Sequence, residues 1–129
     1  MNTDFSITIK SSSRELTAKE KVALKNSNGA IKLDEATKNG EILICPCGYA
    51  VLAIHNEKSA DKDYEQYVIF DKSGERYVTG SKSFFNTFMD IYSELNGENG
   101  DMVEEYSLRV FRKPSRNYAG KEFITCDVI

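Results

Sequence analysis

Several residue types are scarce in this chain. Among 129 residues it has no tryptophan, one histidine, two prolines and three cysteines. A disulfide scaffold of this size usually carries more cysteines and an even number of them, so the cysteine content favours a reducing compartment. No apolar run approaches the roughly 20 residues that a membrane-spanning helix requires. The first residues also show no basic leader followed by an apolar stretch, and we therefore expect a cytoplasmic protein that does not contact membranes.

The composition that remains is typical of a folded domain. Hydrophobic residues make up 40% of the chain and charged residues 29%, which differs from disordered chains. A chain of this length buries roughly two thirds of the surface that its unfolded form exposes. We therefore predict a single domain over residues 1–129, with residues 1–40 as an N-terminal extension and residues 41–129 as the core.

The extension carries three local signals. Residues 5–10 alternate apolar and polar side chains, as in a half-buried strand. Thr17 and Glu20 have the spacing of a capping box, which predicts a short helix after them. Residues 31–33 indicate a brief strand. These segments are expected either to add strands to an edge of the core or to form a dimer contact.

The core shows a regular alternation of strands and turns. Strands are expected at residues 42–54, 64–70, 75–79, 106–113 and 122–128. The first is interrupted at residues 45–48, where proline and glycine favour a bend or bulge in one long, curved strand. After Ser81, apolar side chains recur at helical spacing, which predicts a helix packed against the sheet. A cofactor or partner groove is the alternative interpretation of this aromatic stripe.

The predicted order from residue 42 is strand, strand, strand, helix, strand, strand, which is the order of an OB-fold. We predict an α+β fold that is mainly β: an OB-like curved antiparallel sheet or barrel of about five strands. One helix packs between strands three and four. A Pur-type or Whirly-type nucleic-acid-binding sheet, or a plain meander crossed by one helix, would give a similar order.

A basic segment stands out in an acidic chain. Residues 109–121 carry five basic side chains and no acidic one, although the formal net charge of the protein is −3. Without this segment, 12 basic residues would face 20 acidic ones, a balance of −8. In OB-folds the loop between the last two strands flanks the surface that binds single strands. The segment is therefore expected to bind phosphates, with a solvated loop or a protein-docking surface as the alternative.

Alternation within the fourth predicted strand places Arg109, Phe111 and Lys113 on one face, opposite the apolar residues that point to the core. An aromatic ring between cations suits a single-strand platform, since base stacking is worth about 1–3 kcal/mol per base. The alternative is a ring covered by the aliphatic stems of its neighbours or by the N-terminal segment.

The loop that follows adds further candidates. Arg112, Arg116 and Lys121 are expected there to contact phosphates, with Tyr118 as a second stacking residue. The predicted nucleic-acid-binding residues are therefore Arg109, Phe111, Arg112, Lys113, Arg116, Tyr118 and Lys121.

Metal and catalytic chemistry have less support. Cys45, Cys47 and Cys126 with His55 would supply the ligand types of a zinc site. However, one residue separates the first two cysteines where a zinc knuckle has two, and the other ligands are distant in sequence. A catalytic cysteine with His55 as its base would lack a third group to orient the ring. We expect structural cysteines, with no metal, no cofactor and no catalytic residue.

Two stretches, YVIFDKSGERYVTGSKSFFNTFMDIYSEL and LRVFRKPSRNYAGKEFITCDVI, resemble the small single-stranded-DNA-binding proteins of phages and mobile elements of Gram-positive and gut bacteria. The resemblance covers residues 42–129 and is one of pattern. It implies non-catalytic binding of single-stranded DNA, with RNA left open, during replication or recombination in a bacterial host cell. Further expected partners are a second copy of the chain, through the N-terminal extension, and host or phage replication proteins. Bacterial proteins of that class commonly end in an acidic tail, whereas residues 126–129 read as a strand.

The alternative function is a protein-interaction module, such as a phage inhibitor of a host defence or replication protein. It would bind through an acidic surface, which the net charge of −3 favours. The acidic loop at residues 96–105 lacks the ligand spacing of a calcium site. It is either a solvated loop or a negative surface for a basic partner.

Overall fold

The computed structural model describes residues 5–26, 29–58, 60–98, 100–116 and 119–129. In chain order its elements are β1 (Phe5–Ser12), α1 (Ala18–Lys25), β2 (Ala30–Lys32), α2 (Leu33–Ala36), β3 (Ile42–Ile44), β4 (Pro46–Asn56), β5 (Asp63–Asp71), β6 (Arg76–Thr79), α3 (Lys82–Leu95), β7 (Leu108–Pro114) and β8 (Glu122–Val128).

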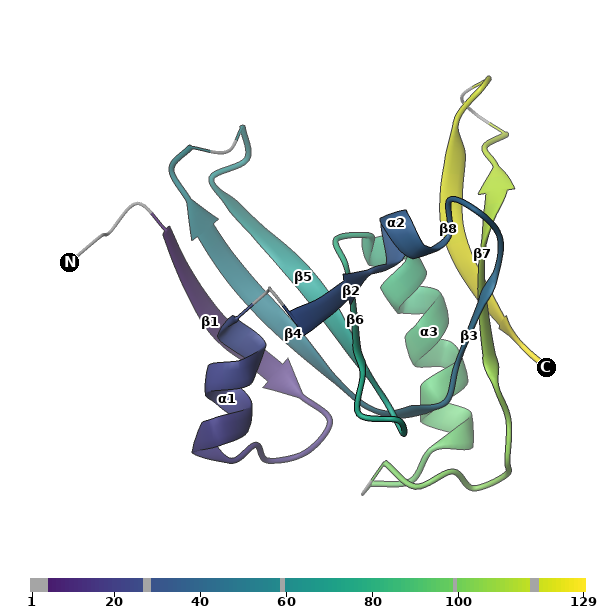
Figure 1. Ribbon diagram of the computed structural model, residues 1–129, viewed down its shortest axis with the longest axis horizontal. Coiled ribbons are helices and arrows are strands. Elements are labelled where there is room, and N and C mark those ends of the chain that lie inside the picture. Colours follow the sequence, from purple (N-terminus) through teal and green to yellow (C-terminus); the bar gives the residue numbers. More distant parts are fainter. Residues whose placement is uncertain (1–4, 27–28, 59, 99, 117–118) are drawn as a thin grey trace.

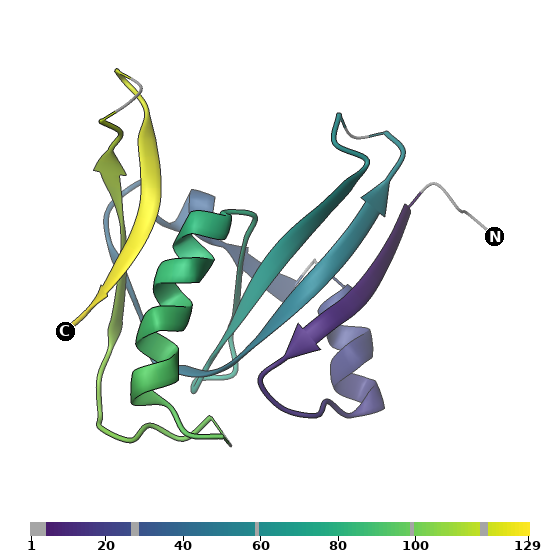
Figure 2. The same ribbon diagram turned by 180° about the vertical axis from the view of Figure 1, so that it is seen from behind.

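The strands form two sheets with α3 between them (Figures 1 and 2). The larger sheet has the order β1-β4-β5-β6-β2, and the smaller sheet has the order β3-β7-β8. All pairings are antiparallel except β2 with β6. The prediction of a mainly β, α+β fold is confirmed. No helix in the described ranges is long and apolar enough to cross a membrane.

The predicted first strand of the core is divided at Cys45 into β3 and β4. β3 pairs with β7, whereas β4 pairs with β5 and has a register shift between Pro46 and Gly48. The bend expected at the proline and glycine is therefore present, and it passes the chain from one sheet to the other. β6 and β8 do not pair in the described part of the chain, so the two sheets form no closed barrel there. The five strands expected in the core are present, and the division of the first one at Cys45 makes six.

The N-terminal segments take the first of their two expected roles, because they supply both edge strands of the larger sheet. β1 pairs with β4 from Phe5 to Ser12, and β2 pairs in parallel with β6. The capping box is present: Thr17 accepts from the Glu20 backbone, and the Glu20 side chain accepts from the Thr17 backbone. Leu33 was expected in a strand but begins α2, and its side chain is fully buried.

Helix α3 fills the space between the sheets with aromatic side chains. Phe84, Phe88 and Tyr92 are buried. On the sheet side, the Tyr49 ring packs edge-on against Phe85, Phe88 and Tyr92, an arrangement that aromatic pairs prefer. The aromatic stripe of the sequence is therefore core packing. The opposite face of the larger sheet forms a second, smaller core with α1, through residues that include Leu24.

The loop after α3 is held by one buried amide. Asn96 donates from Nδ2 to the carbonyl oxygens of Pro46 (3.1 Å) and Gly100 (2.9 Å), and its Oδ1 accepts from the Tyr106 hydroxyl. Because Pro46 starts β4 and Tyr106 precedes β7, this amide ties the loop to both sheets. The helix ends at Leu95, and Asn96 is its C-cap.

Candidate nucleic-acid interface

The outer face of the small sheet carries the predicted aromatic and its two cations. β7 and β8 pair with Arg109 opposite Asp127, Phe111 opposite Thr125 and Lys113 opposite Phe123. The Arg109 guanidinium lies over the Phe111 ring at 4.7 Å from its centroid, and the Lys113 ammonium lies 5.9 Å from it. The three side chains therefore share one face, as the alternation predicted.

Two residues of β7 between the platform positions point to the core. Leu108 and Val110 are fully buried against α3, whereas Phe111 is half-buried. The ring of Phe111 is thus neither fully covered nor fully open. It keeps exposed area between two cationic side chains.

Two exposed apolar residues extend this face beyond the predicted set. Phe123 lies opposite Lys113 and is 42% exposed, and Leu43 lies opposite Arg109 on β3 and is 52% exposed. Both were missed because the sequence interpretation focused on the basic segment. Alternation within their own predicted strands, 122–128 and 42–54, would have placed them there. We call Leu43, Arg109, Phe111, Lys113 and Phe123 the outer-face platform.

Arg109 is paired rather than open. Its Nε donates to Asp127 Oδ1 (2.9 Å) and its Nη2 to Asp127 Oδ2 (2.6 Å), and Glu41 lies 3.8 Å from Nε. The two hydrogen bonds from Arg109 lower the pKa of the Asp127 carboxyl below its ordinary value. A phosphate that approaches Arg109 must therefore compete with a carboxylate.

Arg112 lies in β7, as the predicted strand 106–113 implies, although its phosphate contact was expected in the loop. Its side chain is on the α2 side of the strand, where Nε donates to Thr37 Oγ1 (3.1 Å) and Nη2 donates to the Asp34 carbonyl. It is therefore not part of the outer-face platform. Its proposed contact with phosphate has to be made at a different surface.

The β7–β8 hairpin carries the remaining cations. The Ser115 backbone N–H donates to the Lys121 carbonyl (2.8 Å), so the hairpin continues past the paired strands. Lys113, Arg116 and Lys121 are exposed there, and Tyr118 lies outside the described residues. An open groove of about 650 Å³ runs along the hairpin. Its lining residues are Ser83, Lys113, Pro114, Ser115, Arg116, Lys121, Glu122 and Phe123.

The cysteines and the histidine do not meet. Cys45 and Cys47 are half-buried free thiols and Cys126 is buried. His55 lies eight residues after Cys47 on the same strand, a separation of roughly 26 Å in an extended chain. Within the described ranges no group of His, Cys, Asp and Glu is arranged to hold a metal ion. The four residues are therefore not brought together as zinc ligands or as a catalytic pair.

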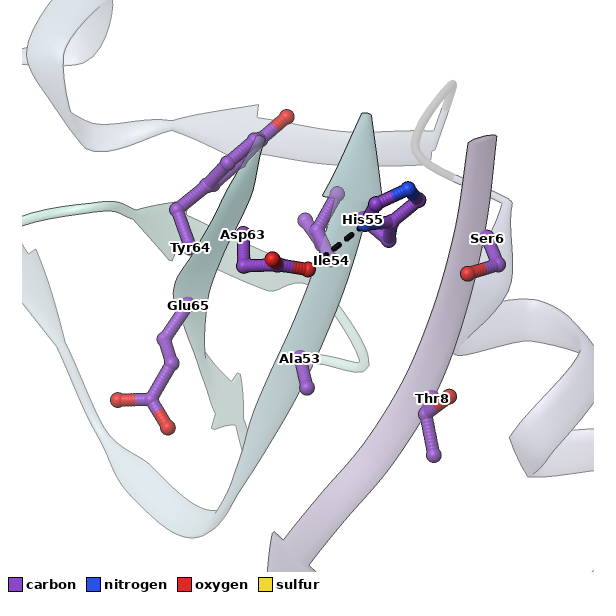
Figure 3. A pocket seen from close by; sticks show the side chains of 8 residues that line it. All are labelled: Ser6, Thr8, Ala53, Ile54, His55, Asp63, Tyr64 and Glu65. Carbon is purple, nitrogen blue, oxygen red and sulfur yellow. Dashed lines mark hydrogen bonds and ion pairs between the residues drawn. The ribbon is translucent and has the colours of Figure 1, made fainter. Parts of the chain in front are cut away.

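His55 instead belongs to an ion-pair cluster at the end of the β4–β5 hairpin. Its Nδ1 lies 2.7 Å from Asp63 Oδ1, and its Nε2 lies 2.7 Å from Glu57 Oε1. The bonds to Asp63 and then to Glu57 raise the pKa of the imidazole. Figure 3 shows His55 and Asp63 directed toward one another at a hollow of about 360 Å³ on the sheet surface. Since both ring nitrogens are engaged, the ring has no free nitrogen with which to act as a base.

Comparison with known proteins places the chain in no family. No family model matches it, and no curated protein or solved structure matches it significantly.

Proposed function

We propose that the protein binds single-stranded DNA, without catalysis, on the outer-face platform and along the β7–β8 hairpin. The observation that carries this proposal is the position of Phe111 between Arg109 and Lys113, with exposed Phe123 and Leu43 on the same face. Flat apolar faces beside cations suit bases and phosphates of a flexible strand. A double helix hides its base faces, so a platform of this kind favours single strands.

The arrangement of the strands supports the same proposal. The long bent strand β3–β4 pairs with β5 on one side and with β7 on the other, and α3 separates β6 from β7 in the chain. These are the neighbours expected of an OB-like sheet, and in the described residues this sheet stays open between β6 and β8. In OB-folds the loop between the last two strands flanks the single-strand surface. The basic hairpin of this protein occupies that position.

The resemblance to phage and mobile-element proteins supplies the biological setting of the proposal, which is replication or recombination in a bacterial cell. The charge distribution agrees with a local binding surface in a protein that is otherwise acidic. The basic hairpin attracts phosphates at short range, while the net charge of −3 limits non-specific attraction.

Stacking can be tested with a matched pair of exposed phenylalanines. Phe123 is 42% exposed on the platform, and Phe5 is 46% exposed on β1 of the other sheet. Replacement of Phe123 by alanine should weaken binding of a labelled oligothymidylate by about 1–3 kcal/mol, whereas Phe5→Ala should not change it. Fluorescence anisotropy with DNA and RNA oligonucleotides gives the affinities. Equal effects of the two variants would contradict stacking on the platform.

Charge can be tested by salt dependence. Each phosphate contact on a single strand contributes roughly 0.7 to the slope of log affinity against log salt. Arg116→Gln should flatten this slope by about that amount, because the side chain is exposed on the hairpin. Lys19→Gln, an exposed charge on α1, is the control. If the wild-type protein shows no salt-sensitive binding between about 50 and 200 mM salt, the proposed function is wrong.

A second candidate, docking of a basic protein partner, is favoured by the loop after α3. Val103 is 73% exposed in this loop, next to the exposed acids Asp101, Glu104 and Glu105. The bonds of Asn96 hold the loop in place. If the protein docks a basic partner through this loop, oligonucleotides should not bind. Val103→Ser should then abolish capture of the partner.

A further inference from the structure

A second hollow lies beside the platform, where β7 continues beyond the end of β3. β3 covers only Leu108, Arg109 and Val110 of β7. In the described part of the chain, the following residues of β7 have no strand on that side, and residues 37–41 border them. The hollow measures about 390 Å³, which lies in the range of about 300–1,000 Å³ typical of small-ligand sites.

Arg112 is fixed in the wall of this hollow. Its bonds to Thr37 Oγ1 and to the Asp34 carbonyl engage Nε and Nη2, and they leave Nη1 without a partner among the described residues. Thr37 is itself buried and donates to the Leu33 carbonyl (2.8 Å), so the guanidinium is held by an ordered group. Both acceptors are neutral, and no carboxylate of the described chain lies within ion-pair distance. A half-buried guanidinium that is oriented but not neutralised favours an anionic ligand.

The other residues that line the hollow supply a second cation for the phosphate and groups that can contact the base. Lys38 is exposed at the rim, and Phe111 forms part of the wall. Glu41 and Glu122 also line the hollow, and carboxylates accept hydrogen bonds from N–H groups, such as the N3–H of thymine. The hollow therefore combines cations that can bind a phosphate, an aromatic ring that can contact a base, and carboxylates that can accept hydrogen bonds from the edge of that base.

We propose that this hollow receives one nucleotide of a bound single strand, with its phosphate on Arg112 and Lys38 and its base against Phe111. This inference rests on the proposed function and names the position of one nucleotide within it. The strand would then run from the platform, over Phe111, to the edge of β7. Arg112 would thus contact phosphate from the α2 side of β7 and not from the hairpin.

The test combines binding with a residue-level readout. Backbone amide NMR signals of residues 37–41 should shift when oligothymidylate is added, and also when thymidine 5′-monophosphate is added. Lys38→Gln should weaken oligonucleotide binding roughly fivefold near 0.1 M salt, whereas Lys19→Gln should have little effect. Arg112→Lys keeps the charge but removes the planar guanidinium with its several N–H donors. It should therefore reduce the ligand-induced NMR shifts at residues 37–41. Urea unfolding of that variant shows whether it remains folded.

Two outcomes would overturn the inference while the proposed function stands. In the first, the oligonucleotide binds but shifts only signals of the hairpin and the platform. In the second, Lys38→Gln behaves as Lys19→Gln does. If the mononucleotide shifts residues 37–41 but no oligonucleotide binds, the hollow binds a free nucleotide only, and both the inference and the single-strand function are wrong. Inorganic phosphate as a third ligand separates recognition of a free anion, which would overturn the inference, from recognition of a nucleotide.

Discussion

Arg109 and Asp127 lie opposite each other on β7 and β8, and the guanidinium donates two hydrogen bonds to the carboxylate. The same guanidinium lies over the Phe111 ring. Asp127 therefore holds Arg109 on one face of the ring that is proposed to stack a base. The carboxylate acts as an internal competitor for the phosphate of a ligand.

Removal of the ion pair between Arg109 and Asp127 should strengthen binding of single-stranded DNA. Asp127→Asn keeps the shape of the side chain but removes its charge, so Arg109 becomes available to a phosphate. We expect the affinity for oligothymidylate to rise roughly fivefold near 0.1 M salt, the gain of about one phosphate contact. Anisotropy titrations measure it. Glu94→Gln, an exposed acid on α3, removes the same charge from another surface, and an equal gain in that variant would show a general charge effect.

Stability should depend on pH through His55. Its pKa is raised in the folded protein by the bonds to Asp63 and then Glu57. The imidazolium therefore contributes stability that is fully present below the unfolded pKa of about 6.5 and is lost as pH rises through the raised folded pKa. His55→Gln should lower the free energy of unfolding more at about pH 5.5 than at about pH 8.5, in urea titrations.

An NMR titration of the same imidazole provides the control. Asp63→Asn should lower the pKa of His55 more than Glu57→Gln does, because the bond to Asp63 is the larger cause of the shift. A wild-type His55 that titrates at its ordinary value would contradict the cluster.

Gly100 should not tolerate a side chain. Its φ of +86° is in the left-handed region, and a Cβ there would collide with the carbonyl oxygen of Cys47. Gly100→Ala should therefore cost more than about 2 kcal/mol of the free energy of unfolding. Gly80 is the matched control, since a Cβ there meets nothing within 4 Å and its φ lies outside the left-handed region. Chemical denaturation of both variants measures the difference.

The Asn96 amide should be similarly sensitive. It satisfies two carbonyl groups and the Tyr106 hydroxyl in a buried position. Asn96→Ala leaves these groups without partners, at about 1–3 kcal/mol for each group that water cannot reach. Asn86→Ala on the exposed side of α3 should be close to neutral. If Asn86→Ala lost stability and Asn96→Ala did not, this role of the Asn96 amide would be contradicted.

Local patterns predicted the local structure of this protein well. The capping box at Thr17, the helix after Ser81 and the direction of Phe111 depend on neighbours in sequence, which periodicity and turn chemistry record. The sequence predicted a bend in the long strand near Cys45, but it did not predict that the chain passes there from one sheet to the other. Which strand pairs with each half depends on contacts distant in sequence.

The candidate site was predicted in part for the same reason. Basic charge and alternation indicated β7 and its hairpin, but the pairing of Arg109 with Asp127 requires the register of β7 and β8. The contact of Arg112 with α2 joins residues that are 75 and 78 positions apart in the chain. No pattern within a strand records such a contact, so Arg112 was placed with the hairpin.

The positions of β1 and β2 bear on how the chain can be shortened. The sequence divided the protein into an extension and a core that begins near residue 41, but the extension supplies the strand at each edge of the larger sheet. A fragment starting at Ile42 would expose unpaired backbone along β4 and β6. Exposed strand edges recruit other chains. We therefore expect such a fragment to aggregate, so studies of binding require the intact N-terminal region.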